Sequence, residues 1–203
     1  MTTLVELTGI EKRFKEPLFL PVSFSLKAGE GLALSGRNGS GKTTLLDIIA
    51  GLRRPDNGSV HVSRPLGYVM QNDGLEGLLS CRDNLRYEAA LCHLSAEESR
   101  QRIAHLAELC GVASFLSKRL SRCSAGMRQR VAFAAALMPT PKVLLLDEAF
   151  SSLDVASVAA MKEILISLMA EGACIIFASH ISGETSDICQ RTLLLPDSVI
   201  RDS

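Results

Sequence analysis

The sequence predicts an α/β fold built on a parallel sheet. Two apolar runs, KVLLLD at 142–147 and ACIIFASH at 173–180, are continuous enough to be strands buried on both faces. Segment 155–172 lies between them, and its apolar residues recur at helical spacing. Buried strands that alternate with helices are typical of a parallel sheet. A change to helical patterns from about residue 75 to 138 indicates a helical insert in that sheet.

The first 70 residues predict short strands around one helix. Val22, Phe24 and Leu26 alternate with polar residues and so share one face of a strand that ends at a turn over 27–30. The strands are predicted within segments 4–9, 22–35, 58–64 and 66–70. A helix over 43–52 ends at Gly51, and Pro55 prevents its continuation.

The remaining elements follow from capping signals. Ser95 and Glu98 form a capping box that starts a helix, which ends at Gly111. RCSAGMRQR at 122–130 is a second helix start, with Ser124 as the cap and an Ala-rich helix after it. The last predicted strand is RTLLL at 191–195.

Composition excludes several classes of protein. A chain of 203 residues suffices for one well-buried α/β domain. Its 22 basic and 22 acidic residues balance, so the chain has no net charge that would attract it to nucleic acid or anionic lipid. No apolar run reaches the roughly 18 residues of a membrane span, and the start lacks a signal-peptide core. We therefore expect a soluble, cytoplasmic protein with no nucleic-acid partner. The six cysteines lack metal-ligand spacing, which favours reduced thiols.

A phosphate-binding loop lies between an apolar strand and a helix. GLALSGRNGSGKTT matches G-x-x-x-x-G-K-[ST] with Gly36, Gly41, Lys42 and Thr43. The glycines allow successive backbone N–H groups to point at a β-phosphate, aided by the helix N-terminus. Lys42 would reach the β- and γ-phosphate oxygens, and the Thr43 hydroxyl is placed for Mg²⁺.

Three further polar residues follow buried strands. In VLLLDE, Asp147 ends a strand and can hold Mg²⁺, while Glu148 can polarise an attacking water. His180 follows the next buried strand, at the carboxyl edge of the sheet, where open α/β folds bind ligands. We expect His180 to contact the γ-phosphate of a bound nucleoside triphosphate.

With these residues in this order, the chain resembles the ATP-binding cassette (ABC) ATPases over its whole length. The ordered elements are Phe14, the phosphate loop, Gln71 in YVMQND, the signature-like CSAGM at 123–127, LLLDE, SSLD and His180. The resemblance implies a P-loop NTPase with a RecA-like mixed-sheet core, an N-terminal antiparallel β subdomain and an inserted α-helical subdomain. It implies one nucleotide-binding domain over 1–203, with 1–74 and 139–203 as the catalytic lobe and 75–138 as the helical lobe.

The resemblance also implies the roles of individual residues. Phe14 would stack on adenine, Gln71 would sense Mg²⁺ and the attacking water, and Asp154 would communicate between two sites. Glu148, His180 and Lys42 would be catalytic, and Thr43, Gln71 and Asp147 would hold Mg²⁺. The nucleotide would contact Phe14 and the loop residues Gly36, Arg37, Asn38, Gly39, Ser40, Gly41, Lys42, Thr43 and Thr44.

The family resemblance explains the second helix start. In this family two cassettes sandwich two ATP molecules, so that the signature of one subunit serves the nucleotide of the other. Ser124, Ala125, Gly126 and Met127 would complete the γ-phosphate site in trans. Cys123, Ala125 and Met127 stand where the family usually has Leu, Gly and Gln, and Ala125 would be strained if it required a positive φ.

The resemblance predicts an ATP-hydrolysing subunit of an ABC transporter. It would lie on the cytoplasmic face of the inner membrane, with transmembrane permease subunits and a second ABC subunit as partners. LLSCRDNLRYEAAL at 78–91 resembles the T-x-x-E-N-L helix start of exporter cassettes, which favours export. Leu75, Leu78 and Leu79 would line a groove for a permease helix, or belong to the helical lobe's own core.

Non-transport members of the family are the alternatives. One is a soluble single-cassette ATPase with an accessory role, for example in iron–sulfur assembly, and another is an ATPase of translation or DNA repair. A third is a nucleotide-binding regulator with little turnover. Cargo selectivity would reside in other subunits, so no residue of this chain is expected to reveal it.

Overall fold

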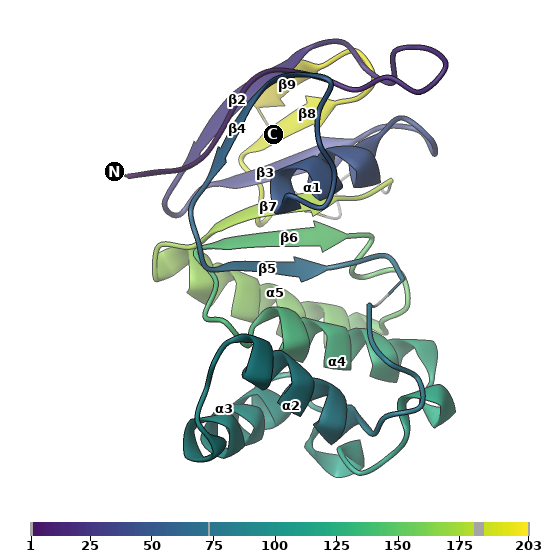
Figure 1. The fold of residues 1–203 in the computed structure, drawn as a ribbon, viewed down its shortest axis with the longest axis vertical. Coiled ribbons are helices and arrows are strands. Elements are labelled where there is room, and N and C mark those ends of the chain that lie inside the picture. The colour runs from purple at the N-terminus through teal and green to yellow at the C-terminus, as the bar shows by residue number, and fades with distance from the viewer. Residues whose placement is uncertain (1, 73, 181–184, 203) are drawn as a thin grey trace.

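The computed structural model describes residues 2–72, 74–180 and 185–202, and a central sheet runs through the middle of the molecule (Figure 1). The sheet has six strands in the order β5-β6-β7-β3-β8-β9. They span β5 Leu66–Val69, β6 Val143–Asp147, β7 Cys174–Ala178, β3 Gly31–Ser35, β8 Arg191–Leu194 and β9 Val199–Asp202. All neighbours pair in parallel except β8 and β9. The predicted α/β class with a parallel sheet is therefore confirmed.

The two apolar runs are the strands buried on both faces. Every residue of β6 and of β7 is buried. Because successive side chains of a strand point to opposite faces, Val143 and Leu145 contribute to one core and Leu144 and Leu146 to another. The two cores on opposite faces of the sheet explain why these strands have no polar alternation.

A second, three-stranded antiparallel sheet covers one face together with helix α1 (Figure 1). Its order is β2-β1-β4, with bounds β2 Val22–Lys27, β1 Thr3–Glu11 and β4 Asn57–Val62, and α1 spans Lys42–Ala50. Val22, Phe24 and Leu26 are buried while the residues between them are exposed, as the alternation predicts. Leu45 and Ile49 of α1 pack in the same core.

Helices cover the opposite face of the central sheet. They are α2 Cys81–Leu91, α3 Ala96–Leu109, α4 Ala125–Ala136 and α5 Val155–Ala170, with short 3-10 turns at Ala113–Phe115 and Leu120–Arg122. The segment that contains α2, α3 and α4 lies between β5 and β6 in sequence, and these helices project away from the three-stranded sheet (Figure 1). Within the described ranges, no helix is long and apolar enough to cross a membrane.

The helix termini follow the predicted capping signals. Ser95 and Glu98 make both hydrogen bonds of a capping box, and the Ser124 side chain caps α4. Gly51 ends α1 in a left-handed conformation with a φ of 84°. These local signals are independent of tertiary contacts, which is why sequence alone located them.

The end of the chain departs from the prediction. RTLLL is not the last strand, because β9 turns back and pairs antiparallel with β8. Ser198 makes this turn possible with a φ of 55°. The segment SVIRDS holds only two apolar residues, too few to show a strand period.

Candidate functional site

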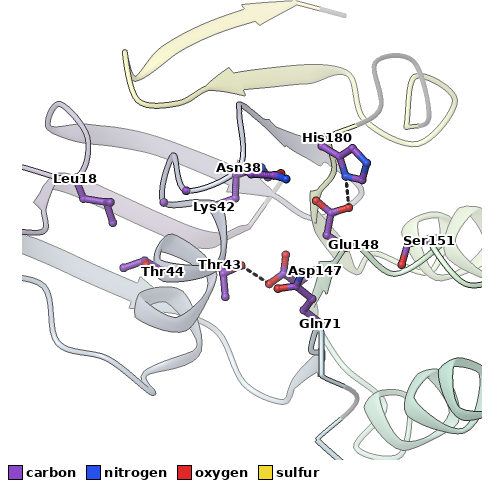
Figure 2. A pocket seen from close by; sticks show the side chains of 12 residues that line it. Leu18, Asn38, Lys42, Thr43, Thr44, Gln71, Asp147, Glu148, Ser151 and His180 are labelled. Atoms are coloured by element: carbon purple, nitrogen blue, oxygen red, sulfur yellow. Dashed lines mark hydrogen bonds and ion pairs between the residues drawn. The ribbon is translucent and has the colours of Figure 1, made fainter. Parts of the chain in front are cut away.

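The carboxyl ends of the parallel strands meet at one edge of the central sheet, where they surround a cavity of about 490 Å³ (Figure 2). β3 leads into the phosphate-binding loop, β6 ends at Asp147, β7 ends two residues before His180, and β5 ends two residues before Gln71. The cavity is lined by Leu18, Asn38, Gly39, Gly41, Lys42, Thr43, Thr44, Gln71, Asp147, Glu148, Ser151 and His180. This edge is where open α/β sheets bind ligands.

The loop that follows β3 is built for close backbone approach. A Cβ atom on Gly36 would lie 2.5 Å from the Leu195 carbonyl oxygen and 2.6 Å from Ser40 Oγ. Gly41 adopts a left-handed conformation as the N-cap of α1, and no side chain caps that helix. The first N–H groups of α1 thus lack a side-chain cap at the cavity edge, a geometry suited to binding an anion.

Lys42 is held against the same loop. Its side chain is buried, and Nζ donates hydrogen bonds to the carbonyl oxygens of Gly36 at 2.8 Å and Arg37 at 3.3 Å. The ammonium is therefore positioned by neutral oxygens. A phosphate oxygen would form a stronger, charge-assisted hydrogen bond with it.

An oxygen-rich site lies where α1 meets β6. Thr43 Oγ1 donates to Asp147 Oδ2 at 2.7 Å, and both residues line the cavity (Figure 2). Burial raises the pKa of Asp147, and the hydrogen bond from Thr43 opposes that change. The other oxygen of Asp147, Oδ1, is buried without a hydrogen-bond partner among the described residues. Within the same residues, Ser40 Oγ is also buried and makes no hydrogen bond. Hydroxyl and carboxylate oxygens are the ligands that Mg²⁺ prefers, so the donor set fits a magnesium ion.

Glu148 and His180 form a polar pair across the ends of β6 and β7. His180 Nδ1 lies 2.5 Å from Glu148 Oε2, and the carboxylate accepts the ring N–H (Figure 2). Glu148 has a φ of 53°, a left-handed conformation unfavourable for a residue with a Cβ. Its N–H donates to the Ala178 carbonyl oxygen at 2.9 Å, which holds the turn. The strained turn presents the Glu148 carboxylate to the cavity.

Gln71 connects this cavity to a second one. The second cavity, of about 350 Å³, is lined by Gln71, Asn72, Ala125, Arg128, Gln129 and Ser152. It lies beside the first turn of α4. Ser124, Ala125, Gly126 and Met127 do not line the phosphate-loop cavity of their own chain. The predicted signature and the predicted nucleotide site are therefore separate within one chain.

The signature residues have well-defined local geometry. Ser124 Oγ accepts a hydrogen bond from the Met127 N–H at 3.3 Å, so the hydroxyl caps α4 in the free chain. Ala125 is the first residue of α4, so the strain of a positive φ does not arise there. A Cβ on Gly126 would lie 2.8 Å from the Ser152 carbonyl oxygen. The first turn of α4 thus abuts the loop that leads to Asp154.

Asp154 caps a different helix. Its side chain accepts a hydrogen bond from the Ser157 N–H at 2.8 Å at the start of α5, and hydrogen bonds from Ser157 lower its pKa. It does not line the phosphate-loop cavity. Its predicted role between two sites stays a prediction.

The loop between β1 and β2 places one apolar residue outside the cavity and another inside it. Phe14 does not line the cavity; the residue is 61% exposed, and the Arg53 guanidinium carbon lies over its ring, 5.7 Å from the ring centroid. Its predicted stacking on adenine stays a prediction. Leu18, which sequence reasoning missed, lines the cavity beside Thr44 (Figure 2). A bridge between Arg13 and Pro17 folds the loop so that Leu18 reaches the site. No local sequence pattern distinguishes Leu18 from its apolar neighbours.

Most of the predicted nucleotide-binding residues of the loop line the cavity. Asn38, Gly39, Gly41, Lys42, Thr43 and Thr44 line it, while Gly36, Arg37 and Ser40 shape the loop without lining it. Ser151, also missed from the sequence, lies on the far side from Leu18 (Figure 2). It follows Glu148 by three residues, and its N–H donates to the Glu148 carbonyl oxygen at 3.1 Å.

Comparison with known proteins agrees with this geometry. A family model described as ABC transporter matches residues 19–151. An uncharacterized ABC transporter ATP-binding protein of Nostoc sp. is 38% identical over 185 residues, and the match covers 85% of this chain and 55% of that protein. A Nod factor export ATP-binding protein I of Burkholderia orbicola is 32% identical over 206 residues, which cover 95% of this chain and 68% of that protein.

A solved structure shares the fold. The dimeric structure of a bacterial ABC transporter cassette superposes with a TM-score of 0.90 at 23% identity, and the match covers 98% of each chain. The chain here thus spans about half to two thirds of the length of the two relatives named above, and nearly all of this solved cassette.

Proposed function

This chain belongs to the ABC transporter family, and we propose that it is the ATP-hydrolysing subunit that drives transport through separate membrane subunits. One observation carries the proposal. Lys42, Thr43, Asp147, Glu148 and His180 converge on a single cavity although they come from distant parts of the sequence. This set provides an anion cradle, a cation site and a base.

Each residue has a distinct part in ATP hydrolysis. The loop N–H groups and the start of α1 bind the phosphates, and Lys42 Nζ leaves the loop carbonyls to contact the β- and γ-phosphate oxygens. Glu148 accepts a proton from the attacking water, and His180 orients the Glu148 carboxylate. Because His180 is half exposed, it can also turn toward a γ-phosphate.

Thr43 and Asp147 would hold Mg²⁺, with Gln71 at the edge of the site. When bound, the ion would neutralise part of the negative charge of the phosphates. The unpartnered Asp147 Oδ1 and the raised pKa of Asp147 support this assignment, because both conditions are relieved by a cation.

We propose that a second cassette completes the site. Ser124 and Gly126 lie at the start of a helix that does not line the cavity of its own chain, so they are available to the nucleotide of a facing subunit. A helix N-terminus opposite the γ-phosphate would favour its negative charge. The dimeric state of the solved cassette that shares this fold supports the arrangement.

The membrane partner would bind the helices of the 75–138 segment. We assign 1–74 and 139–203 to the catalytic lobe and 75–138 to the helical lobe. Of the three leucines expected at a groove, Leu75 lines a cavity against β5 and α4, while Leu78 is 76% exposed and Leu79 lies at the surface. The chain would sit on the cytoplasmic face of the inner membrane, and the relative named for Nod factor export supports an exporter.

The experiment is purification of the tagged chain from detergent-solubilised membranes of its host. We expect a polytopic membrane protein in a fixed ratio to the chain, and ATPase activity in the complex. A Lys42→Ala variant is the control, because it should assemble but not hydrolyse ATP. Recovery of the chain only from the soluble fraction would contradict the transport assignment.

A further inference from the structure

Two cysteine side chains meet in the core of the helical lobe, where α2 packs against α4 (Figure 1). Cys81 Sγ lies 3.6 Å from Cys123 Sγ, a hydrogen-bond contact between two thiols that are 42 positions apart in the sequence. Cys81 is fully buried, and Cys123 is 8% exposed. The fold therefore brings together the two sulfur atoms that a disulfide would join.

The backbone around this pair is held by hydrogen bonds between two segments. The Cys81 N–H donates to the Lys118 carbonyl oxygen at 2.9 Å, and Ser80 forms an antiparallel bridge with Arg119. Cys123 Sγ also lies 3.5 Å from the Arg119 carbonyl oxygen, to which the thiol donates. A disulfide has a sulfur–sulfur distance of about 2.05 Å, so the two sulfur atoms would need to approach by about 1.5 Å.

The two thiols differ in their access to solvent and in their surroundings. Burial raises the pKa of Cys81 to about 12, and the nearby charge of Lys118 opposes that rise. The Cys81 thiol therefore stays protonated at neutral pH and is a poor first nucleophile. Cys123 keeps some exposure and lies directly before the start of α4, so an oxidant in solution reaches Cys123 first.

Cys123 is also the residue that precedes Ser124, the cap of α4 and part of the signature. Both residues have an extended backbone in the short connection between the 3-10 turn Leu120–Arg122 and α4. Cys81, by contrast, belongs to the first turn of α2. The movement that closes a disulfide would therefore fall on Cys123 and displace Ser124 with it. A displacement of about 1 Å in a group that positions a reactant can lower a rate about a hundredfold.

We propose that Cys81 and Cys123 are a peroxide-sensitive thiol pair, and that their disulfide lowers ATP hydrolysis by displacing the signature. The inference rests on the proposed function, because the signature would act on the nucleotide of a facing subunit. It adds a regulatory modification to that site. At rest the pair stays reduced, and a reducing dithiol restores it after oxidation.

The oxidation takes two steps and consumes one hydrogen peroxide. The Cys123 sulfur attacks one peroxide oxygen, the O–O bond breaks, and a sulfenic acid and one water form. The Cys81 sulfur then attacks the Cys123 sulfur, so that the S–S bond forms and the S–O bond breaks. The departing hydroxide takes the Cys81 proton and leaves as a second water. Two thiols are thereby oxidised by two electrons, and the peroxide is reduced to two waters.

The test treats the full chain, purified in the reduced state, with hydrogen peroxide. After alkylation of the remaining thiols, unreduced tryptic peptides should include a cross-linked pair that contains Cys81 and Cys123 and lacks two hydrogen atoms. Steady-state ATPase activity should fall at least about tenfold as the cross-linked fraction approaches completion. Dithiothreitol should remove the cross-link and restore the activity together.

Two variants identify the partners of the reaction. Cys81→Ala should form no cross-link, and its Cys123 sulfenic acid, which has no thiol to react with, should be labelled by dimedone. If Cys81→Ala does not fold, Cys81→Ser serves the same purpose with a side chain of similar size. Cys92→Ala is the matched control, because Cys92 lies at the opposite end of α2. It should cross-link and lose activity as the wild type does.

The outcomes separate this proposal from the proposed function. Peroxide-treated wild type without the cross-link between Cys81 and Cys123 would overturn the proposal, and so would complete cross-linking with unchanged ATPase activity. Peroxide inhibition of equal size before any cross-link forms would also overturn it. Absence of ATPase activity in the reduced chain and in its membrane complex would instead contradict the proposed function, since the cross-link is detected by mass without any activity.

Discussion

Replacing Ser124 by Asp separates the two roles that the structure gives to this residue. In the free chain Ser124 Oγ caps α4 by accepting the Met127 N–H at 3.3 Å, and the residue has an extended backbone with φ of −66° and ψ of 164°. Asp is as good an N-cap as Ser and adds a favourable charge at the helix N-terminus. In the proposed dimer, however, the same carboxylate would face the γ-phosphate of the partner's ATP.

The capping role and the phosphate-binding role predict different effects of the two substitutions on stability and on hydrolysis. Ser124→Ala should lower the unfolding free energy by about 1 kcal/mol, which is a decrease of roughly 2–4 °C in Tm for a domain of this size. Ser124→Asp should leave it unchanged or raise it by up to about 1 kcal/mol. Repulsion between unit charges about 4 Å apart at an effective dielectric constant near 20 is about 4 kcal/mol, or roughly a thousandfold in rate.

The assay is thermal unfolding without nucleotide together with steady-state ATPase activity for the wild type and both variants. We expect Ser124→Asp to be as stable as the wild type but to lose two to three orders of magnitude in hydrolysis. Ser124→Ala should be less stable and retain more activity. Normal hydrolysis by a stable Ser124→Asp variant would refute the placement of the signature at a phosphate. Equal destabilisation by both substitutions would refute the capping role.

Three other predictions concern the cavity. Glu148→Gln should keep ATP binding, lose about 10²–10⁴ of the hydrolysis rate and trap an ATP-dependent dimer in size-exclusion chromatography with Mg-ATP; tight ATP binding by a strictly monomeric variant would contradict the sandwich model. Lys42→Ala should bind a fluorescent ATP analogue more weakly, and unchanged affinity would exclude the phosphate-loop assignment. Because burial raises the pKa of Asp147, the folded nucleotide-free chain gains stability from that residue at acid pH and loses it as the pH rises through the raised value. Asp147→Asn should therefore flatten that part of the pH profile of urea unfolding from about pH 4 upward, and an identical profile would contradict the raised pKa that burial gives this carboxylate.

Local signals explain why much of the fold was predictable. The continuous apolar runs of β6 and β7, the alternation in β2 and the caps at Ser95 and Ser124 depend on a few adjacent residues. β9 was missed because its four residues pair only with β8 and bury little surface. A strand that is stabilised by its neighbour carries no signal of its own in the sequence.

The site was predictable where residues lie at strand ends or in the loop motif. Thr43, Asp147, Glu148 and His180 come together because parallel strands end at one edge of the sheet. Leu18 could not be predicted, since it reaches the cavity through the fold of the loop between β1 and β2. The left-handed backbone of Glu148 was equally invisible, because Glu is not a residue that favours such a turn.

Mixing two inactive variants tests most directly whether two chains share each ATP site. Lys42→Ala damages the phosphate loop and Ser124→Asp damages the signature, so each alone should be inactive. A mixed dimer would hold one intact site, built from the loop of the Ser124→Asp chain and the signature of the Lys42→Ala chain. We predict that an equal mixture recovers up to about a quarter of the wild-type ATPase activity, because half of randomly formed dimers are mixed and each has one working site. Activity no greater than the sum of the separate variants would contradict the shared site.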